Sequence, residues 1–462
     1  MKKNSRLSGK KPAQLSKLDR SCAGIDVGAT QLFVCIAKDS SHQEVRTFTT
    51  LTPDIKCMIQ WLKKNNVKSI AMESTGVYWI PPFEFLEEAG FEVLLVNAYF
   101  FKAVPGRKTD VQDCQWIQQL HSYGLLRGSF RPSNSIVELR AYVRQRSRLF
   151  ASAGVQVQLM QKSLIQMNLQ LHTVISDITG LTGQNIIKAI LEGQQNPKAL
   201  AELCVGRCRK NKKLVAKALE GNYREEHVFS LKQAYDAYDF FHRQVEQCET
   251  AIQAVLVKLQ RKKSREAQEQ TATNPKTTQV SRKSKKKSYN RSPYSFDADS
   301  SIQKVLNVDL NTIPGIDSNT AMKILSEIGT DMSRWRNVKA FTSWLGLCPG
   351  NKISGGKILS SRSKPSSNRA AQALRMAAFS LYRSQSYLGA FFRRIRSRLG
   401  APKAITALAH KLAKIVYRMI QTGESYKEVG ENHYEESHRK RVVANLKKRA
   451  SEMGFELMPV TA

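Results

Sequence analysis

Long apolar runs are missing from this sequence of 462 residues, and acidic residues are scarce in it. No apolar stretch reaches the ~18 residues that a membrane-spanning helix needs. The polar and basic segment 1–20 lacks the apolar core of a secretory signal. Lys and Arg number 73 against 38 Asp and Glu, which gives a formal net charge of +35. These features argue against a membrane protein and favour a polyanionic partner that contacts several parts of the chain.

Cysteine is also sparse, with eight residues that form no disulfide-framework pattern. Cys204 and Cys208 are the closest pair, and no second Cys or His pair at ligand spacing follows them. A zinc site is therefore not expected. Thiols that stay reduced are typical of an intracellular protein.

Alternating strand and helix patterns occupy residues 21–134. They predict strands over 24–29, 31–37, 44–50, 69–72 and 91–96, and helices over 54–64, 81–89 and 110–123. Three meander strands followed by helix, strand, helix, strand and helix is the element order of a ribonuclease-H-like domain. We therefore expect an α/β domain of this type at the N-terminal end.

The other segments are predicted from periodicity and composition. Residues 135–260 have helical periodicity and are expected to form a coiled-coil-like arm, with one long helix over 229–259. Residues 1–20 and 261–300 are basic and low in complexity, which predicts a disordered arm and a disordered linker. A mainly α-helical domain is expected over 301–428. A tail over 429–462 should contain one helix, at 436–452.

Four acidic residues lie where a plain structural role is awkward for a carboxylate. Asp26 interrupts one apolar run, Glu73 ends another, and Asp110 and Asp113 are three apart where a helix begins. Any one of them alone is explained by a solvated strand end or a helix N-terminus. Together, two carboxylates at strand ends and two on one helical face can converge into an oxygen cage, which typically holds Mg²⁺ against a phosphate. With a net charge of +35, that phosphate is expected to belong to a nucleic acid.

A rival interpretation exists for the stretch 24–30, which also resembles the first phosphate loop of actin-like sugar kinases and ATPases. Such proteins need a second Asp-x-Gly phosphate loop and a Gly-rich adenosine motif, and the sequence contains neither. A small-molecule kinase also has little use for so large a positive charge.

Two motifs in the C-terminal part suggest contacts with phosphate. The stretch 310–317, with Pro-Gly-Ile before a helical pattern, predicts a helix-hairpin-helix whose free N–H groups take a DNA phosphate; a plain helical hairpin is the alternative. Further on, Ser354 precedes Gly355 and Gly356 among Lys352, Lys357 and Arg362. Glycines allow a bulky substrate to approach closely, so this hydroxyl is a candidate nucleophile, although Ser-Gly-Gly is also a common flexible turn.

These motifs resemble the transposases of insertion-sequence-110 type, which have a RuvC-like domain with a DEDD signature. Asp26, Glu73, Asp110 and Asp113 match the signature, and Pro-Gly-Arg-Lys-Thr-Asp-x-x-Asp at 105–113 is particularly close. The second half matches that family's C-terminal domain in Ile-Pro-Gly-Ile from 313, Leu-Gly-Leu-x-Pro from 345, Ser-Gly-Gly-Lys from 354 and Leu-Arg-Met-Ala-Ala from 374. The run 404–414 is similar to the branch named for insertion sequence 1111. The resemblance covers about residues 20–428.

The resemblance implies a recombinase with a composite active site. In it, the acidic quartet binds Mg²⁺, and Ser354 attacks a DNA phosphodiester to form a phosphoserine-linked strand. It further implies a homo-oligomer, dimer to tetramer, on donor and target double-stranded DNA, guided by a structured noncoding bridge RNA. The expected location is the cytoplasm of a bacterial or archaeal cell, at the nucleoid. Two alternatives stay open: a RuvC-like Mg²⁺-dependent nuclease of junction-resolvase type without serine chemistry, and a non-catalytic nucleic-acid-binding protein.

Overall fold

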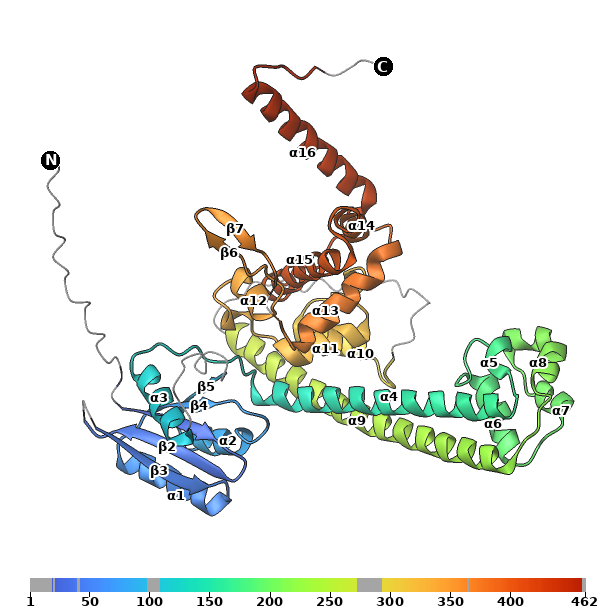
Figure 1. Ribbon diagram of the computed structural model, residues 1–462, viewed down its shortest axis with the longest axis horizontal. Coiled ribbons are helices and arrows are strands. Elements are labelled where there is room, and N and C mark those ends of the chain that lie inside the picture. The colour runs from blue at the N-terminus through green and yellow to red at the C-terminus, as the bar shows by residue number, and fades with distance from the viewer. Residues whose placement is uncertain are drawn as a thin grey trace, which may run out of the picture. The chain divides into compact units, whose positions relative to one another are not determined.

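The structure, a computed structural model, describes residues 19, 21–39, 42–97, 109–271, 293–363 and 365–458 (Figure 1). The chain divides into two compact units, Met1–Arg131 and Pro132–Ala462. Among the described helices, none combines the length and apolarity that a membrane span requires. The predicted basic arm 1–20 falls outside the described residues except for Asp19.

The first unit is built on a five-stranded sheet in the order β3-β2-β1-β4-β5. β1, β2 and β3 pair antiparallel, and β4 and β5 run parallel to β1. This mixed α/β order is consistent with the predicted ribonuclease-H-like domain. The strands are β1 Cys22–Val27, β2 Gln31–Ala37, β3 Gln43–Thr49, β4 Ser69–Glu73 and β5 Glu92–Val96.

Helices cover both faces of this sheet. On one face, Ile55, Met58 and Leu62 of α1 (Thr52–Lys64) share a core with Phe83 and Leu86 of α2 (Ile80–Glu88) and with the strands. The spacing of these α1 residues places them on one side of the helix, which is why α1 forms an amphipathic helix here. On the other face, α3 (Asp110–Ser122) packs on β1 and β2 and buries Ile117 against β4 and β5.

The second unit begins with a long helical arm. α4 (Asn134–Gln166) and α9 (Glu225–Thr271) run alongside each other, and a cluster of short helices at one end encloses its own apolar core (Figure 1). Arg146 on α4 and Glu249 on α9 form a buried ion pair of 2.7 Å. The short elements are α5 Leu171–Val174, α6 Leu181–Leu191, α7 Pro197–Glu202, η2 Gly206–Asn211 and α8 Lys212–Ala218.

Both boundaries of the disordered linker predicted over 261–300 are wrong. α9 continues to Thr271, because the stretch 261–271 is rich in Lys, Arg, Glu, Gln and Ala, which are all good helix formers. The low complexity of residues 261–271 therefore did not indicate disorder. At the other end, α10 (Ala298–Leu306) begins before the predicted boundary, and residues 272–292 lie outside the described part.

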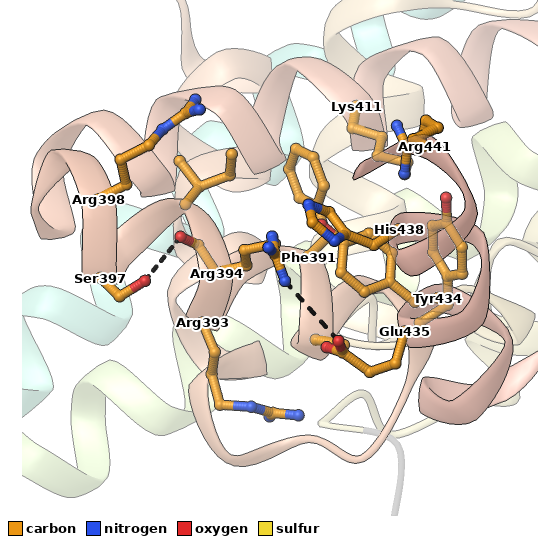
Figure 2. A pocket seen from close by; sticks show the side chains of 13 residues that line it. Phe391, Arg393, Arg394, Ser397, Arg398, Lys411, Tyr434, Glu435, His438 and Arg441 are labelled. Carbon is orange, nitrogen blue, oxygen red and sulfur yellow. Dashed lines mark hydrogen bonds and ion pairs between the residues drawn. The ribbon is translucent and has the colours of Figure 1, made fainter. Parts of the chain in front are cut away.

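A helical domain with one small hairpin completes the second unit. α14, α15 and α16 line a cavity of about 690 Å³ (Figure 2). α16 begins at Gly430, six residues before the predicted tail helix. The elements are η3 Leu310–Thr312, α11 Ser318–Ile328, η4 Met332–Arg334, α12 Val338–Trp344, β6 Lys352–Ser354, β7 Lys357–Ser360, α13 Arg369–Ser380, η5 Leu381–Arg383, α14 Tyr387–Leu399, α15 Ala401–Thr422 and α16 Gly430–Glu452.

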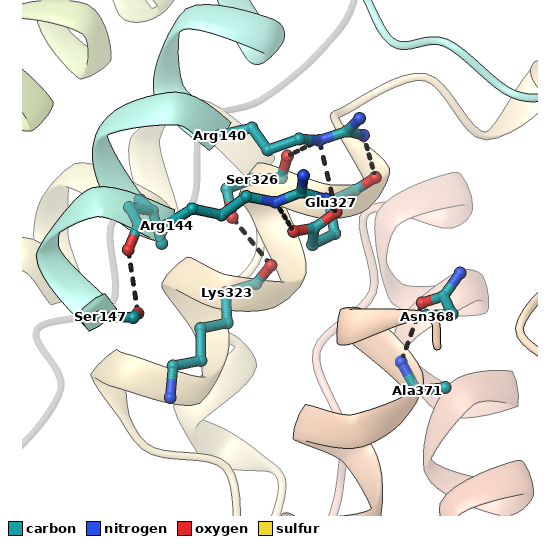
Figure 3. A network of polar contacts seen from close by, with 9 residues as sticks. Arg140, Arg144, Ser147, Lys323, Ser326, Glu327, Asn368 and Ala371 are labelled. Atoms are coloured by element: carbon teal, nitrogen blue, oxygen red, sulfur yellow. Dashed lines mark hydrogen bonds and ion pairs between the residues drawn. The ribbon is translucent and has the colours of Figure 1, made fainter. Parts of the chain in front are cut away.

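Two arginines of α4 hold the C-terminal end of α11 (Figure 3). Arg140 donates to the carbonyl oxygens of Ser326 (3.1 Å) and Glu327 (2.8 Å). Arg144 donates two hydrogen bonds of 2.8 Å to the Glu327 carboxylate. The last carbonyls of a helix have no partner within it, and a cationic side chain there is favourable. The arm and the helical domain are thus joined by a specific polar contact.

Candidate functional site

The register of two strands brings Asp26 and Glu73 together. β1 and β4 run parallel with Ile25 opposite Met72, so that the next residues along are Asp26 and Glu73. Both side chains are buried, with residue exposures of 9% and 1%. Of the ionisable groups around Asp26, Glu73 influences it most, and the Thr75 hydroxyl donates to Glu73.

Helix α3 supplies the other two carboxylates from its first turn. Thr109 caps this helix, its side chain accepting a hydrogen bond of 3.3 Å from the Gln112 N–H. Asp110 is exposed and Asp113 is half-buried. Acidic residues are favourable at this end of a helix because its free N–H groups are positive.

Close packing at Gly24 allows α3 to lie on β1. A Cβ at this glycine would stand 2.3 Å from the Gln118 nitrogen and 2.5 Å from the Cys114 carbonyl oxygen. Only a residue without a side chain lets the helix backbone approach this near. Gly24 therefore sets the separation between the strand that carries Asp26 and the helix that carries Asp110 and Asp113. The sequence alone did not reveal this role, although Gly24 stands two residues before Asp26.

The four carboxylates act on one another electrostatically. Burial raises the pKa of Asp26 to about 7, and the hydrogen bond and charge of Glu73, followed by the charges of Asp110 and Asp113, add to the rise. Like charges that share a site disfavour ionisation unless a cation neutralises them. The structure thus gathers the four predicted residues into one electrostatic cluster.

The donor set of this cluster is the kind that a hard divalent cation takes, since it offers only carboxylate oxygens. As the side chains stand, however, the described residues include no group of three or more His, Cys, Asp or Glu at metal-holding distances. The cluster fits a divalent ion in its chemistry and would need its side chains to turn toward that ion.

Ser354 lies at the tip of the β6–β7 hairpin. It pairs with Lys357 across a turn made by Gly355 and Gly356, whose φ angles are +53° and +75°. Two consecutive left-handed residues are what a tight two-residue hairpin turn requires, and glycine adopts them without strain. Ser354 and both neighbouring lysines, Lys352 and Lys357, are exposed. A large substrate could reach the hydroxyl in a positively charged setting.

The predicted phosphate site at the Pro-Gly-Ile turn is not favoured by the structure. Gly315 makes the expected turn with φ +84°, and α11 follows it. At the start of α11, however, the Asp317 carboxylate accepts a hydrogen bond of 2.8 Å from the Thr320 N–H. This cap takes up one of the free N–H groups and adds a negative charge, which repels a phosphate. A plain helical hairpin is the better description.

Two family models match the chain. The first, described as a transposase and named for the DEDD type of IS110, matches residues 23–169 and includes the acidic quartet. The second, described as the transposase IS116/IS110/IS902 family, matches residues 308–393 and includes Ser354. The chain is a DNA transposase with IS110-family domains. None of the curated proteins matches it.

The candidate site residues fall in different compact units of this transposase. The acidic quartet belongs to the first compact unit and Ser354 to the second. Transposase domains of the DEDD type usually use divalent metal ions, which agrees with the carboxylate donor set. The elements after residue 393, which include α15 and α16, lie beyond both matches.

Proposed function

We propose that this transposase cuts and rejoins DNA strands with two sets of residues. Asp26, Glu73, Asp110 and Asp113 would hold Mg²⁺, and Ser354 would be the nucleophile. The observation that carries the metal part is the electrostatic coupling of Asp26 to the other three carboxylates. A bound Mg²⁺ would supply positive charge to the phosphate oxygens of the DNA. The accessible hairpin tip supports the role of Ser354.

In the proposed reaction the Ser354 Oγ attacks the phosphorus of a DNA phosphodiester. The hydroxyl proton leaves to solvent or a base, a phosphoserine bond forms, and the bond from phosphorus to the leaving sugar oxygen breaks. That oxygen takes up a proton and becomes a free hydroxyl. A hydroxyl of another strand then attacks the phosphoserine phosphorus, which rejoins DNA and returns the serine. Lys352 and Lys357 would bind the phosphodiester and stabilise the developing serine alkoxide by their charge.

The experiment that tests the nucleophile is the substitution Ser354→Ala. We expect complete loss of strand cleavage with unchanged nucleic-acid binding, since the basic surface stays intact. Wild-type complexes, denatured and digested, should carry DNA phosphate on Ser354. Ser360→Ala, Ser361→Ala and Ser363→Ala are matched controls from the same hairpin region and should stay active. Cleavage by Ser354→Ala, or an adduct on another serine, would overturn the assignment and favour the RuvC-like nuclease without serine chemistry.

We also infer that a structured noncoding RNA guides the reaction and that the active form is a dimer or tetramer. The resemblance to the insertion-sequence-110 type and its 1111-like branch supports both inferences. Base pairing would then select the donor and target sequences. Light scattering of the purified transposase should report at least a dimer; a monomer in the active complex would contradict the oligomer.

A further inference from the structure

Helix α16 carries a dense run of basic residues. The stretch 439–449 contains six Lys or Arg and no acidic residue. Every residue in it is exposed, whereas Tyr434, near the start of the helix, is buried. The positive charge of this stretch favours a polyanion as its partner over another surface of this basic chain.

Helix α14 adds a second basic element beside the base of α16. Arg393, Arg394, Arg396 and Arg398 fall within six residues. Tyr434 of α16 packs edge-on against Tyr387 and Phe391, with ring centroids 5.1 and 6.2 Å apart. This aromatic contact fixes the base of α16 on α14, and Arg441 of α16 lines the same cavity as Arg393, Arg394 and Arg398 of α14.

Five of the thirteen residues that line the cavity between these helices are Lys or Arg, and one is acidic (Figure 2). Arg394 pairs with Glu435 at 3.8 Å, and Arg393 pairs with Glu431 at 2.5 Å. Arg398 and Arg441 also line it, and within the described residues neither has an Asp or Glu at ion-pair distance. Desolvation, followed by the charges of Arg394 and Arg441, lowers the pKa of His438. The cavity thus holds more positive charge than its own acids neutralise.

The aromatic rings in this cavity are not open for base stacking. Tyr434 is buried, and the Lys411 ammonium lies over Tyr387 and Phe391 at 4.1 and 4.6 Å from their centroids. Proteins that bind single strands usually stack bases on exposed rings. A site with charge but no free ring face suits backbone phosphates instead.

The shape of α16 favours duplex DNA. An α-helix with its side chains is about 10–12 Å wide and fits a major groove of about 12 Å. The major groove of an RNA duplex is deep and narrow and does not admit a helix.

We propose that α14 and α16 clamp the backbone of duplex DNA, with Arg398 and Arg441 binding phosphate and the stretch 439–449 lying in the adjacent major groove. Arg398 and α16 lie beyond both family-model matches, whereas the part of α14 up to Arg393 lies within the second match. The inference rests on DNA as the substrate of the transposase, and needs neither the metal site nor the serine nucleophile.

The test measures DNA binding by the full chain carrying Ser354→Ala, so that cleavage plays no part. Binding of a duplex of about 30 base pairs is measured over a range of salt concentrations. Adding Arg398→Gln and Arg441→Gln should lower the slope of log affinity against log salt by about two, since each phosphate that is no longer neutralised reduces the slope by close to one. Arg398→Lys with Arg441→Lys keeps both charges and should keep most of the slope.

A matched control removes the same charge elsewhere. Lys198→Gln with Lys213→Gln, two exposed lysines on α7 and α8, should leave the slope unchanged. An unchanged slope in the arginine variant, or an equal fall in the lysine control, would refute the clamp. If the arginine variant loses affinity only for a structured RNA and not for the duplex, duplex DNA is not what binds this surface.

Hydroxyl-radical footprinting of the unsubstituted α14 and α16 keeps the proposal testable if the arginine variant fails to fold. Duplex DNA should protect residues 439–449 from labelling. Absence of protection at saturating DNA would overturn the proposal. Because these readouts concern binding alone, they are independent of the outcome at Ser354 or at the acidic quartet.

Discussion

Asp26 is a buried carboxylate, and the ionisable group that influences it most is another carboxylate, Glu73. Without a cation, an ionised Asp26 therefore destabilises the first unit. Asp26→Asn keeps the shape and removes the charge. We expect it to raise the free energy of unfolding by roughly 1–3 kcal/mol at pH 8 in chelator, while it abolishes transposition. Urea unfolding monitored by circular dichroism measures the change.

The sign of the pH dependence follows from the raised pKa. The folded state keeps the Asp26 proton up to about pH 7, whereas the unfolded state loses it near its ordinary value. Stability in chelator should then fall as pH rises from about 4 to 7, and the advantage of Asp26→Asn should vanish below pH 4. Mg²⁺ should stabilise the wild type more than the variant.

Asp110→Asn is the matched control, because it removes one charge of the same cluster from an exposed position. It should not stabilise the metal-free protein, since it also gives up a favourable charge at the start of α3. Equal stability changes for the two variants would contradict the account of Asp26.

At the scale of elements, the contact of β1 with α3 positions the quartet. Gly24→Ala places a methyl group against the backbone of Gln118 and Cys114, and the backbone has to move. We expect a loss of roughly 2–4 kcal/mol in unfolding free energy and a weaker stabilisation by Mg²⁺.

Gly154→Ala is the control, because Gly154 lies inside α4 and the position of its added Cβ is open space. It should stabilise by roughly 0.5–1 kcal/mol. Mg²⁺ stabilising Gly24→Ala as strongly as wild type would refute this role for Gly24.

The elements show how far the sequence could predict this fold. Apolar runs and helical spacing located β1 to β5 and α1 to α3, since each buries a side whose pattern is visible in the sequence. The grouping of Asp26 with Glu73 followed from their places at strand ends. The close approach of α3 to β1 could not be predicted in this way, because a glycine in a strand does not indicate which backbone packs against it. The end of α9 was misplaced, because polar helix formers and disordered segments share a composition.

The phosphate site predicted at the start of α11 shows the same limit of sequence-based prediction. The Pro-Gly-Ile turn correctly predicted the turn at Gly315 and the helix that follows it, but the function of the helix start depended on one side chain, Asp317. An aspartate after such a turn is a common helix cap, and this signal was available in the sequence. The basic run 439–449 was also visible as a charge pattern, although its place beside α14 was not.

At the scale of the whole molecule, the large positive charge dominates the binding of nucleic acids. A chain of +35 binds any polyanion at low salt, so affinity alone says little about guidance by RNA. If a cognate RNA guides the transposase, it should bind at least tenfold more tightly than an arbitrary duplex of equal length at about 200 mM salt. There, counterion release contributes less and specific contacts more. Competition binding with labelled RNA measures the ratio, and equal affinities would leave a transposase that reads DNA without an RNA guide.

If Ser354 is the nucleophile, as we propose, the hairpin that bears it affects the fidelity of the transposase. A two-stranded hairpin outside a larger sheet is marginally stable in water, and β6–β7 pairs with no further strand among the described residues. Holding Ser354 in one position for attack would thus use some of the energy of substrate binding, as in induced fit. Correct DNA would supply that energy across many contacts, whereas a chance encounter with the chromosome would not. A weakly held nucleophile would in this way protect the host genome from unscheduled breaks.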